Sequence, residues 1–323
     1  MGRDSRRFRK KVKEIVRKLL FNSGAAAVGF AKAGSVDEDV SNRFRKWIEE
    51  GNHAGMTFLK NHVNLRTHTD NVLPGAKSVI SLAFSYFPEL LRNNDQPVIA
   101  TYAHGEDYHD VIKELLRPVV IELQKKFGGD WRICIDSAPV AERFWALKGG
   151  LGKRGLNGSI IVDGCGGYCF LCEILTTVEF ESDVPITEGC GNCGKCIENC
   201  PTGALTNDGT IDSRKCISYL TIEKKEDFTE EEASLLGKNS DSRGFLFGCD
   251  LCLKVCPYNY DISPTKISSF QSKPQILELN PDMIEKMSES DFKAKFRKSP
   301  IKRCKLAGLK RNARIILHPN FPN

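Results

Sequence analysis

Two kinds of hydrophobic pattern alternate along the first part of the chain. Apolar residues at helical spacing predict amphipathic helices at Lys11–Asn22, Val40–Glu50, Asp110–Phe127 and from Val140 to about Lys148. Shorter apolar runs predict strands at Ala25–Ala31, Ser78–Tyr86, Val98–Ala103, Arg132–Asp136, Ser159–Val162 and about Phe170–Val178. Because helices and strands alternate, this part is expected to form an α/β or α+β unit.

The pattern changes after this unit. Residues 185–264 are rich in cysteine, and past Pro264 the chain returns to helical spacing, with Ser290 as a predicted helix N-cap. We therefore predict three domains, which cover residues 1–184, 185–264 and 265–323. The fold class expected from this order is α+β, with a cysteine-rich middle domain and a short helical C-terminal tail.

Cysteines of the middle domain follow two related runs. The first, Cys190-x-x-Cys193-x-x-Cys196-x-x-x-Cys200-Pro201, has the spacing of a bacterial ferredoxin, in which the fourth cysteine ligates the other 4Fe–4S cluster. The second run has Leu246 where its first cysteine would stand, so Cys216 is the predicted substitute. The predicted ligands are Cys190, Cys193, Cys196 and Cys256 for one cluster, and Cys200, Cys216, Cys249 and Cys252 for the other. Zinc is the alternative, because paired C-x-x-C also binds it.

Composition narrows the class of protein further. The chain has 323 residues, 13 cysteines and 27% charged residues, and it contains no apolar run of the ~20 residues that span a membrane. Thiolates that bind iron need a reducing compartment, so a cytoplasmic location is expected. The net charge is +6, and ten Lys and Arg residues without any Asp or Glu lie between Lys293 and Arg314. This segment is either a surface for a polyanion or a solvated helix face.

Other polar residues are candidates for catalysis or binding. Asp136 ends a predicted strand, where a carboxylate can act in a cleft, although the same position also suits a helix N-cap. Asp107-x-His109 begins like the cobalamin-ligating motif D-x-H-x-x-G, but Ile112 replaces the glycine, so His109 is not expected to ligate cobalt.

A third group of cysteines has its own spacing. Cys165-x-x-x-Cys169-x-x-Cys172 matches the cluster motif of radical S-adenosylmethionine enzymes. The alternative is that these three thiols pack as small apolar side chains.

Taken together, the motifs resemble those of the epoxyqueuosine reductases, cobalamin-dependent iron–sulfur enzymes of queuosine synthesis in tRNA. The resemblance extends over almost the whole chain and includes both cysteine runs. Its other segments are Leu73–Val79, Tyr102–His109, Asp136–Arg143, Phe170–Thr176, Cys216–Thr221 and Ser299–Arg303. One departure is Leu156, which stands where the family usually has lysine.

This resemblance implies both cofactors and partners. It implies an N-terminal α/β domain that binds base-off cobalamin, a ferredoxin-like domain with two 4Fe–4S clusters, and Asp136 as proton donor to an epoxide oxygen. The cobalamin neighbours that it implies are Met56, Tyr102, Asp136, Ile160, Leu171 and Ser218. The implied partners are tRNA near its anticodon and an external low-potential electron donor, with a monomeric enzyme and no membrane. A related reductase of another substrate, a two-cluster electron carrier and a radical S-adenosylmethionine enzyme remain alternatives.

Overall fold

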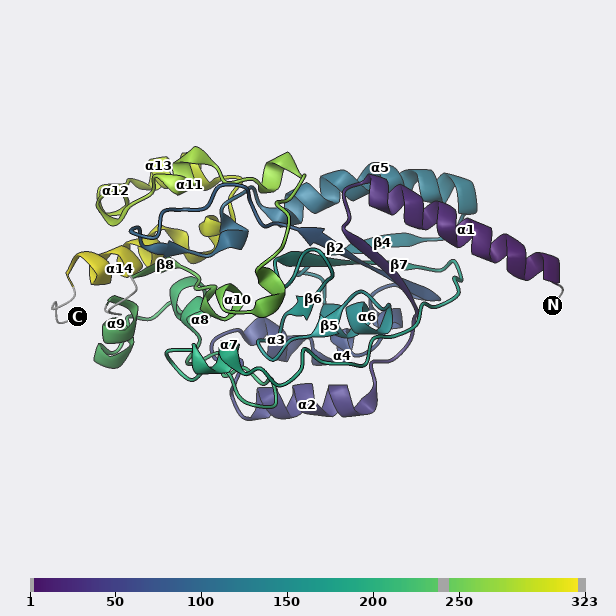
Figure 1. Ribbon diagram of the computed structural model, residues 1–323, viewed down its shortest axis with the longest axis horizontal. Coiled ribbons are helices and arrows are strands. Elements are labelled where there is room, and N and C mark those ends of the chain that lie inside the picture. The colour runs from purple at the N-terminus through teal and green to yellow at the C-terminus, as the bar shows by residue number, and fades with distance from the viewer. Residues whose placement is uncertain (1–2, 238–243, 319–323) are drawn as a thin grey trace.

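A four-stranded sheet forms the centre of the N-terminal half (Figure 1). The computed structural model describes residues 3–237 and 244–318, with side chains from residue 10. The sheet order is β1 (Ala27–Lys32), β2 (Ser78–Ser85), β7 (Cys169–Thr176) and β4 (Trp131–Cys134). Every pair in it is antiparallel. The expected mixture of helix and sheet is confirmed, but the α/β arrangement predicted for this half is corrected to α+β, because α/β units have parallel strands.

Helices cover both faces of this sheet. On one face lie α1 (Arg3–Asn22) and α5 (Tyr108–Phe127), whose apolar residues meet the even-numbered positions of β7. Successive strand residues point to opposite faces, so the odd-numbered positions of β7 face α6 (Glu142–Lys148) on the other side. In Figure 1, α1 and α5 lie above the sheet and α6 lies below it. The segment between β4 and α6 carries Asp136.

Helix α6 approaches β1 through two glycines. A Cβ atom added to Gly29 would overlap the carbonyl oxygen of Gly149, at the end of α6. We expect Gly29→Ala to lower the free energy of unfolding by about 1–3 kcal/mol, because the backbones must separate. Chemical denaturation measures the change. Gly34→Ala is not a matched control, since Gly34 has a φ of 152°, which residues with a side chain rarely adopt. The control is Ala27→Gly, on the same strand as Gly29. An unchanged midpoint for Gly29→Ala would contradict the close approach.

Two predicted elements differ from those in the structure. The strand predicted at Val98–Ala103 stops at Ile99, and Thr101–Ala103 form a 3₁₀ turn. The turn begins there because the Thr101 N–H donates to the carboxylate of Asp250 instead of a strand. The predicted N-cap Ser290 is also wrong. Ser288 caps α13 (Glu289–Phe296) in a capping box with Asp291.

The C-terminal residues form a packed unit and not a loose tail. Strand β8 (Phe245–Phe247) pairs in parallel with β3 (Val98–Ile99), and α14 (Lys305–Leu317) packs against β8. Leu246 of β8 is fully buried among apolar residues of α12–α14. The predicted segments 185–264 and 265–323 therefore share an apolar core with each other and with β3. In Figure 1 this unit and the free end of α1 lie at opposite ends of the long axis.

Short elements complete the chain. In the N-terminal half these are α2 (Glu38–Glu49), α3 (Thr57–Asn61), α4 (Val63–Arg66), β5 (Lys153–Arg154) and β6 (Ile160–Ile161). In the C-terminal half they are α7 (Lys195–Glu198), α8 (Ile217–Ile222), α9 (Glu230–Gly237), α10 (Leu251–Lys254), α11 (Pro274–Leu277) and α12 (Pro281–Glu285). Among the described residues, none of the helices has both the length and the apolar character needed to cross a membrane.

Candidate functional site

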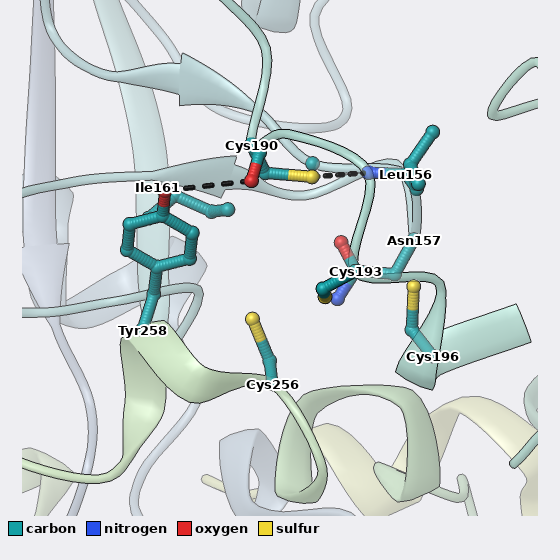
Figure 2. A pocket seen from close by; sticks show the side chains of 9 residues that line it. Leu156, Asn157, Ile161, Cys190, Cys193, Cys196, Cys256 and Tyr258 are labelled. Carbon is teal, nitrogen blue, oxygen red and sulfur yellow. Dashed lines mark hydrogen bonds between the residues drawn. The ribbon is translucent and has the colours of Figure 1, made fainter.

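Four cysteines from two separate parts of the sequence line one hollow. They are Cys190, Cys193, Cys196 and Cys256, the first predicted ligand set, and Figure 2 shows them with the surrounding side chains. Leu156 and Tyr258 also line the hollow. The Leu156 N–H donates to the Cys190 sulfur at 3.4 Å, and the Tyr258 hydroxyl donates to the Cys190 carbonyl oxygen at 3.4 Å. The fold therefore brings the first predicted set together.

The donor set of this hollow fits an iron–sulfur cluster. Burial raises the pKa of the Cys196 and Cys256 thiols, and negative charge on Cys190 and Cys193 raises it further. Bound iron relieves this repulsion, since it binds the thiolate form. N–H···S hydrogen bonds such as that from Leu156 are among the features that tune such clusters. Within the described ranges, no three His, Cys, Asp or Glu side chains converge on a single-ion site. A 4Fe–4S cluster is larger than a single metal ion, so the four cysteine thiolates that bind it stand farther apart than the ligands of one ion.

The second predicted set also gathers in space. Burial raises the pKa of Cys252 to about 12, with further contributions from nearby Asp250, Cys216, Cys196 and Cys200. Burial raises the pKa of Cys249 as well, and Cys252 and Cys216 are among its charged neighbours. Cys216 therefore lies close enough to both thiols to influence them, as the predicted substitute ligand must. The charge of Cys196 also acts on the pKa of Cys252, which indicates that the two sets are adjacent.

The two cysteine runs adopt the same local conformation. Gly194 and Asp250 each precede a short helix, α7 or α10, and each has a φ of 67°. Glycine adopts this left-handed conformation without strain, and aspartate is one of the few other residues that does so readily. Asp250 is further held by the Thr101 N–H at 2.6 Å. Leu246, in the place of the missing cysteine, is buried in the C-terminal core, so the fourth thiolate has to come from elsewhere.

Asp136 lies in a second site, on the loop between β4 and α6. Its φ is 42°, an unusual conformation for a residue with a side chain. The Tyr108 hydroxyl donates to Asp136 Oδ2 at 2.8 Å, and His109 Nε2 lies 3.2 Å from the same oxygen. The Asp136 N–H donates to Glu142 Oε1 at 2.6 Å. Ala141, not Asp136, is the N-cap of α6, so the helix-cap interpretation of Asp136 is wrong.

The charges around Asp136 correct one expectation. A carboxyl group that donates a proton at neutral pH needs a raised pKa, and burial can raise it. Burial does act in that direction, but hydrogen bonds from His109 and Tyr108 and the positive charges of His109 and Arg303 lower the pKa below its ordinary value. The side chain is 60% exposed, which weakens both effects. Asp136 is therefore ionised at neutral pH in this structure.

Two neighbours of Asp136, His109 and Glu142, hold protons more tightly than usual. Burial lowers the pKa of His109, but hydrogen bonds to Asp107 and Asp136 reverse the shift and raise it to about 9. Burial raises the pKa of Glu142, and the charge of Asp136 raises it further. Asp107 caps α5, and Tyr108 and His109 contact Asp136. These two contacts were not identified from the sequence.

The predicted cobalamin neighbours form three local groups. Ile160 and Leu171 share an apolar cluster on the α6 side of the sheet. Tyr102 contacts the ring of Tyr108, which in turn bonds Asp136. Met56 and Ser218 lie beside a contact between the Gly55 N–H and the Tyr219 hydroxyl. Among the residues that the structure describes, no single contact joins all three groups.

The three cysteines of the radical-enzyme motif do not converge. Cys165 and Cys169 pack in the cluster on the α6 side of the sheet, whereas Cys172 lies in the core on the opposite face, next to α1 and α5. Positions 169 and 172 of a strand necessarily point to opposite faces. Burial raises the pKa of Cys169 to about 12 and raises that of Cys172 well above its ordinary value. They are core thiols, and the radical-enzyme alternative is wrong.

The basic C-terminal segment is partly neutralised within the chain. Lys302 pairs with Asp107, Arg303 with Glu223 and Arg314 with Glu285, while Arg311 donates to the carbonyl oxygens of Leu220, Lys224 and Glu226. These four cations have structural roles. Lys295 and Lys298 instead line a surface hollow with Lys273, and the Lys298 carbonyl accepts from the Asp107 N–H at 2.7 Å. The hollow that holds these two lysines is therefore joined through Asp107 to His109, a neighbour of Asp136.

Comparison with known proteins identifies the family of this chain. Residues 189–259 match the family model of the 4Fe–4S double cluster binding domain, which defines an iron–sulfur protein and overturns the zinc alternative. Residues 66–137 match the model described as "Epoxyqueuosine reductase QueG". The epoxyqueuosine reductase of Cellulophaga algicola is 35% identical over 94% of this chain and 97% of its own length. The chain thus belongs to the epoxyqueuosine reductase family, and it is an oxidoreductase.

Solved structures of this family have the same fold. The crystal structure of epoxyqueuosine reductase with an epoxyqueuosine-modified tRNA-Tyr stem loop superposes with a TM-score of 0.87, at 28% identity, over 96% of this chain and 81% of that one. A structure from Bacillus subtilis gives a TM-score of 0.84 at 28% identity, over 95% and 82% of the two chains. That structure has the loop of its catalytic aspartate swung out of the active site.

Proposed function

We propose that this chain reduces epoxyqueuosine in tRNA to queuosine. The observation that carries the proposal is the conjunction of two adjacent four-thiol sets with the Asp136 site, in a chain of this family. Two clusters supply a path for electrons, and Asp136 with His109 supplies a path for protons. Loss of the epoxide oxygen as water requires both.

The electron path runs from the surface inward. Cys193 is exposed, so the first cluster is accessible to an external low-potential donor. Cys249 and Cys252 of the second set flank Asp250, which is bonded to Thr101, the neighbour of Tyr102. The second cluster is therefore the one linked to the Tyr102 and Asp136 region. The ligand assignment of all eight cysteines is part of this proposal.

Cobalamin is the cofactor that we propose for the substrate side. On the face of the sheet toward α6, the polar side chains of Ser81, Ser85 and Glu173 share the surface with apolar Ile160 and Leu171. A large ring that bears amide groups fits such a mixed surface. We propose that these residues, with Met56, Tyr102, Asp136 and Ser218, hold the cofactor. When bound, it supplies the reductive chemistry at the epoxide carbons.

Both ring nitrogens of His109, the histidine nearest the site, contact carboxylates. Nδ1 of His109 lies 2.8 Å from Asp107 Oδ1, and Nε2 lies 3.2 Å from Asp136. Neither ring nitrogen is therefore available as a metal ligand, which supports a cofactor bound without imidazole from His109.

The tRNA is the partner that we propose for the lysine hollow. This hollow is lined by Gly105, Glu106, Lys273, Gln275, Ile276, Lys295, Lys298 and Ser299. Lys273 pairs with Glu106 at 2.9 Å, whereas no ion pair is formed by Lys295 or Lys298 among the described residues. A backbone phosphate can pair with these two lysines. The Asp107 N–H donates to the Lys298 carbonyl oxygen, so a phosphate bound in the hollow would lie near the Asp136 site, where we propose the modified nucleotide binds.

Removing the two lysines should weaken binding in a salt-dependent way. If each contacts one phosphate, Lys295→Ala/Lys298→Ala should reduce the slope of log affinity against log salt by about 1.4–1.8. KM should rise more than kcat falls, because the chemistry lies elsewhere. Binding of an epoxyqueuosine-modified stem loop at several salt concentrations measures the slope. The control is Lys125→Ala/Lys126→Ala, at the far end of α5. Equal slopes for the two double variants would exclude the hollow as a phosphate site.

The proposed function is tested by reconstitution without oxygen. Protein loaded with iron, sulfide and cobalamin, and supplied with a low-potential reductant, should convert epoxyqueuosine in tRNA to queuosine, detected by mass spectrometry of the nucleosides. Protein that holds both clusters and cobalamin but forms no queuosine would point to a related reductase of another substrate. Failure to bind cobalamin would favour an electron carrier.

A further inference from the structure

His109, near the start of α5, connects two carboxylates. We propose that protonated His109 is the proton reservoir of the reaction, which delivers a proton through Asp136 to the leaving epoxide oxygen. The inference rests on the proposed function, because it names the proton source of the same site. His109 acts through Asp136 and is therefore a positioning residue.

The contacts of the ring define its protonation state. Nδ1 lies 2.8 Å from Asp107 Oδ1, and Nε2 lies 3.2 Å from Asp136 Oδ2. An ionised carboxylate only accepts hydrogen bonds, and a neutral imidazole has a single N–H. Both contacts are hydrogen bonds at the same time only when both ring nitrogens carry a proton. Because the lowered pKa of Asp136 leaves it ionised, the geometry selects the imidazolium form of His109, and Asp136 cannot itself start as the proton donor.

The surrounding charges act in both directions. Asp107 and Asp136 face the ring and favour its positive charge, and Glu142 adds negative charge behind Asp136. Lys302 pairs with Asp107, Arg303 acts on Asp136, and the N-terminus of α5 carries partial positive charge, all of which oppose protonation. The two direct carboxylate contacts prevail and raise the pKa of His109 to about 9.

Tyr108 is the rival donor, because its hydroxyl bonds the same carboxylate oxygen at 2.8 Å. Burial, followed by the charge of Asp136, raises the pKa of this phenol far above its usual value. A group that holds its proton so tightly is a poor acid at neutral pH. Its ring stacks on His109 with centroids 4.1 Å apart and on Phe170 at 4.3 Å. Tyr108 therefore orients the histidine and the carboxylate, while His109 carries the mobile proton.

The step balances in atoms and charge. Conversion of an epoxide to an alkene breaks two C–O bonds, forms the second bond of C=C, takes up two electrons and two protons, and releases water. The electrons come from the external reductant through the clusters. The first proton passes from His109 Nε2 to the Asp136 carboxylate and from there to the oxygen. Solvent supplies the second proton and reprotonates His109, and the exposure of Asp136 gives it access.

The first test needs no turnover. In the full chain with its clusters, before cobalamin is added, NMR titration of the ring protons should give His109 a pKa near 9, and the Asp136→Asn variant should lower it. A pKa at or below the ordinary value of about 6.5 would overturn the proposal.

The second test uses the pH profile of single turnover in the cobalamin-loaded enzyme. The wild-type rate should fall as pH rises through about 9, where His109 loses its proton. His109→Asn should lower the neutral-pH rate about 10²-fold and remove this alkaline limb. His109→Gly should regain rate with added imidazole, whereas Tyr108→Phe should keep the limb. A wild-type profile in His109→Asn would overturn the proposal, and an inactive wild type would instead contradict the proposed function.

Discussion

Replacing Cys216 with alanine is expected to abolish turnover and to lower the iron content of the protein from about eight to about four atoms. Cys216 is the residue just before α8, and its thiol lies among those of Cys249 and Cys252. Its loss leaves the second cluster with three thiolates and a gap in the electron path. Iron and sulfide analysis together with electron paramagnetic resonance of the reduced protein measures the outcome.

A second cysteine outside both sets provides the control. Cys304 is half-buried before α14, and its thiol donates to the carbonyl oxygen of Ile301. Cys304→Ala should keep about eight irons and most of the activity. If Cys216→Ala also keeps its full iron content, the fourth ligand of the second cluster comes from another residue and the crossed assignment has to be revised.

The two cysteine sets could be predicted from the sequence because ligand spacing is a local property. Three of the four ligands of the first set lie within seven positions, from Cys190 to Cys196, and α7 needs only one left-handed residue before it. Cys216 was predicted by counting thiolates, and its position near Cys249 and Cys252 supports that choice.

The proton path could not be predicted in the same way. His109 and Asp136 are separated by 27 positions, and they meet only because α5 and β4 pack on the same sheet. Whether the pKa of Asp136 is raised or lowered depends on the balance between burial and the charge of the neighbouring His109. That balance cannot be read from a sequence. Sheet direction has the same origin. Alternating helices and strands left α/β and α+β open, and only the packed sheet shows that every strand is antiparallel to its neighbour.

Replacing Asp136 with asparagine should lower turnover by about 10²–10⁴-fold while both clusters remain intact. Asparagine preserves the shape of the side chain and can still accept from the Tyr108 hydroxyl. It removes the negative charge that favours imidazolium at His109, and it breaks the path from Nε2 to the substrate oxygen. kcat and kcat/KM should therefore fall together, as expected for a group that acts in the transition state. Single-turnover kinetics with cobalamin-loaded protein measures the effect.

The matched control is Asp130→Asn, at the exposed start of β4, which should keep wild-type kinetics. Asp136→Glu separates charge from position, because it retains a carboxylate but extends it from a backbone with a φ of 42°. We expect it to keep a raised pKa at His109 while turnover still falls, since the oxygen must meet both His109 and the substrate. If Asp136→Asn turned over at the wild-type rate, the proton would have to reach the epoxide oxygen by another route. Glu142, whose burial raises its pKa and whose carboxylate contacts the Asp136 N–H, would then be the next residue to replace.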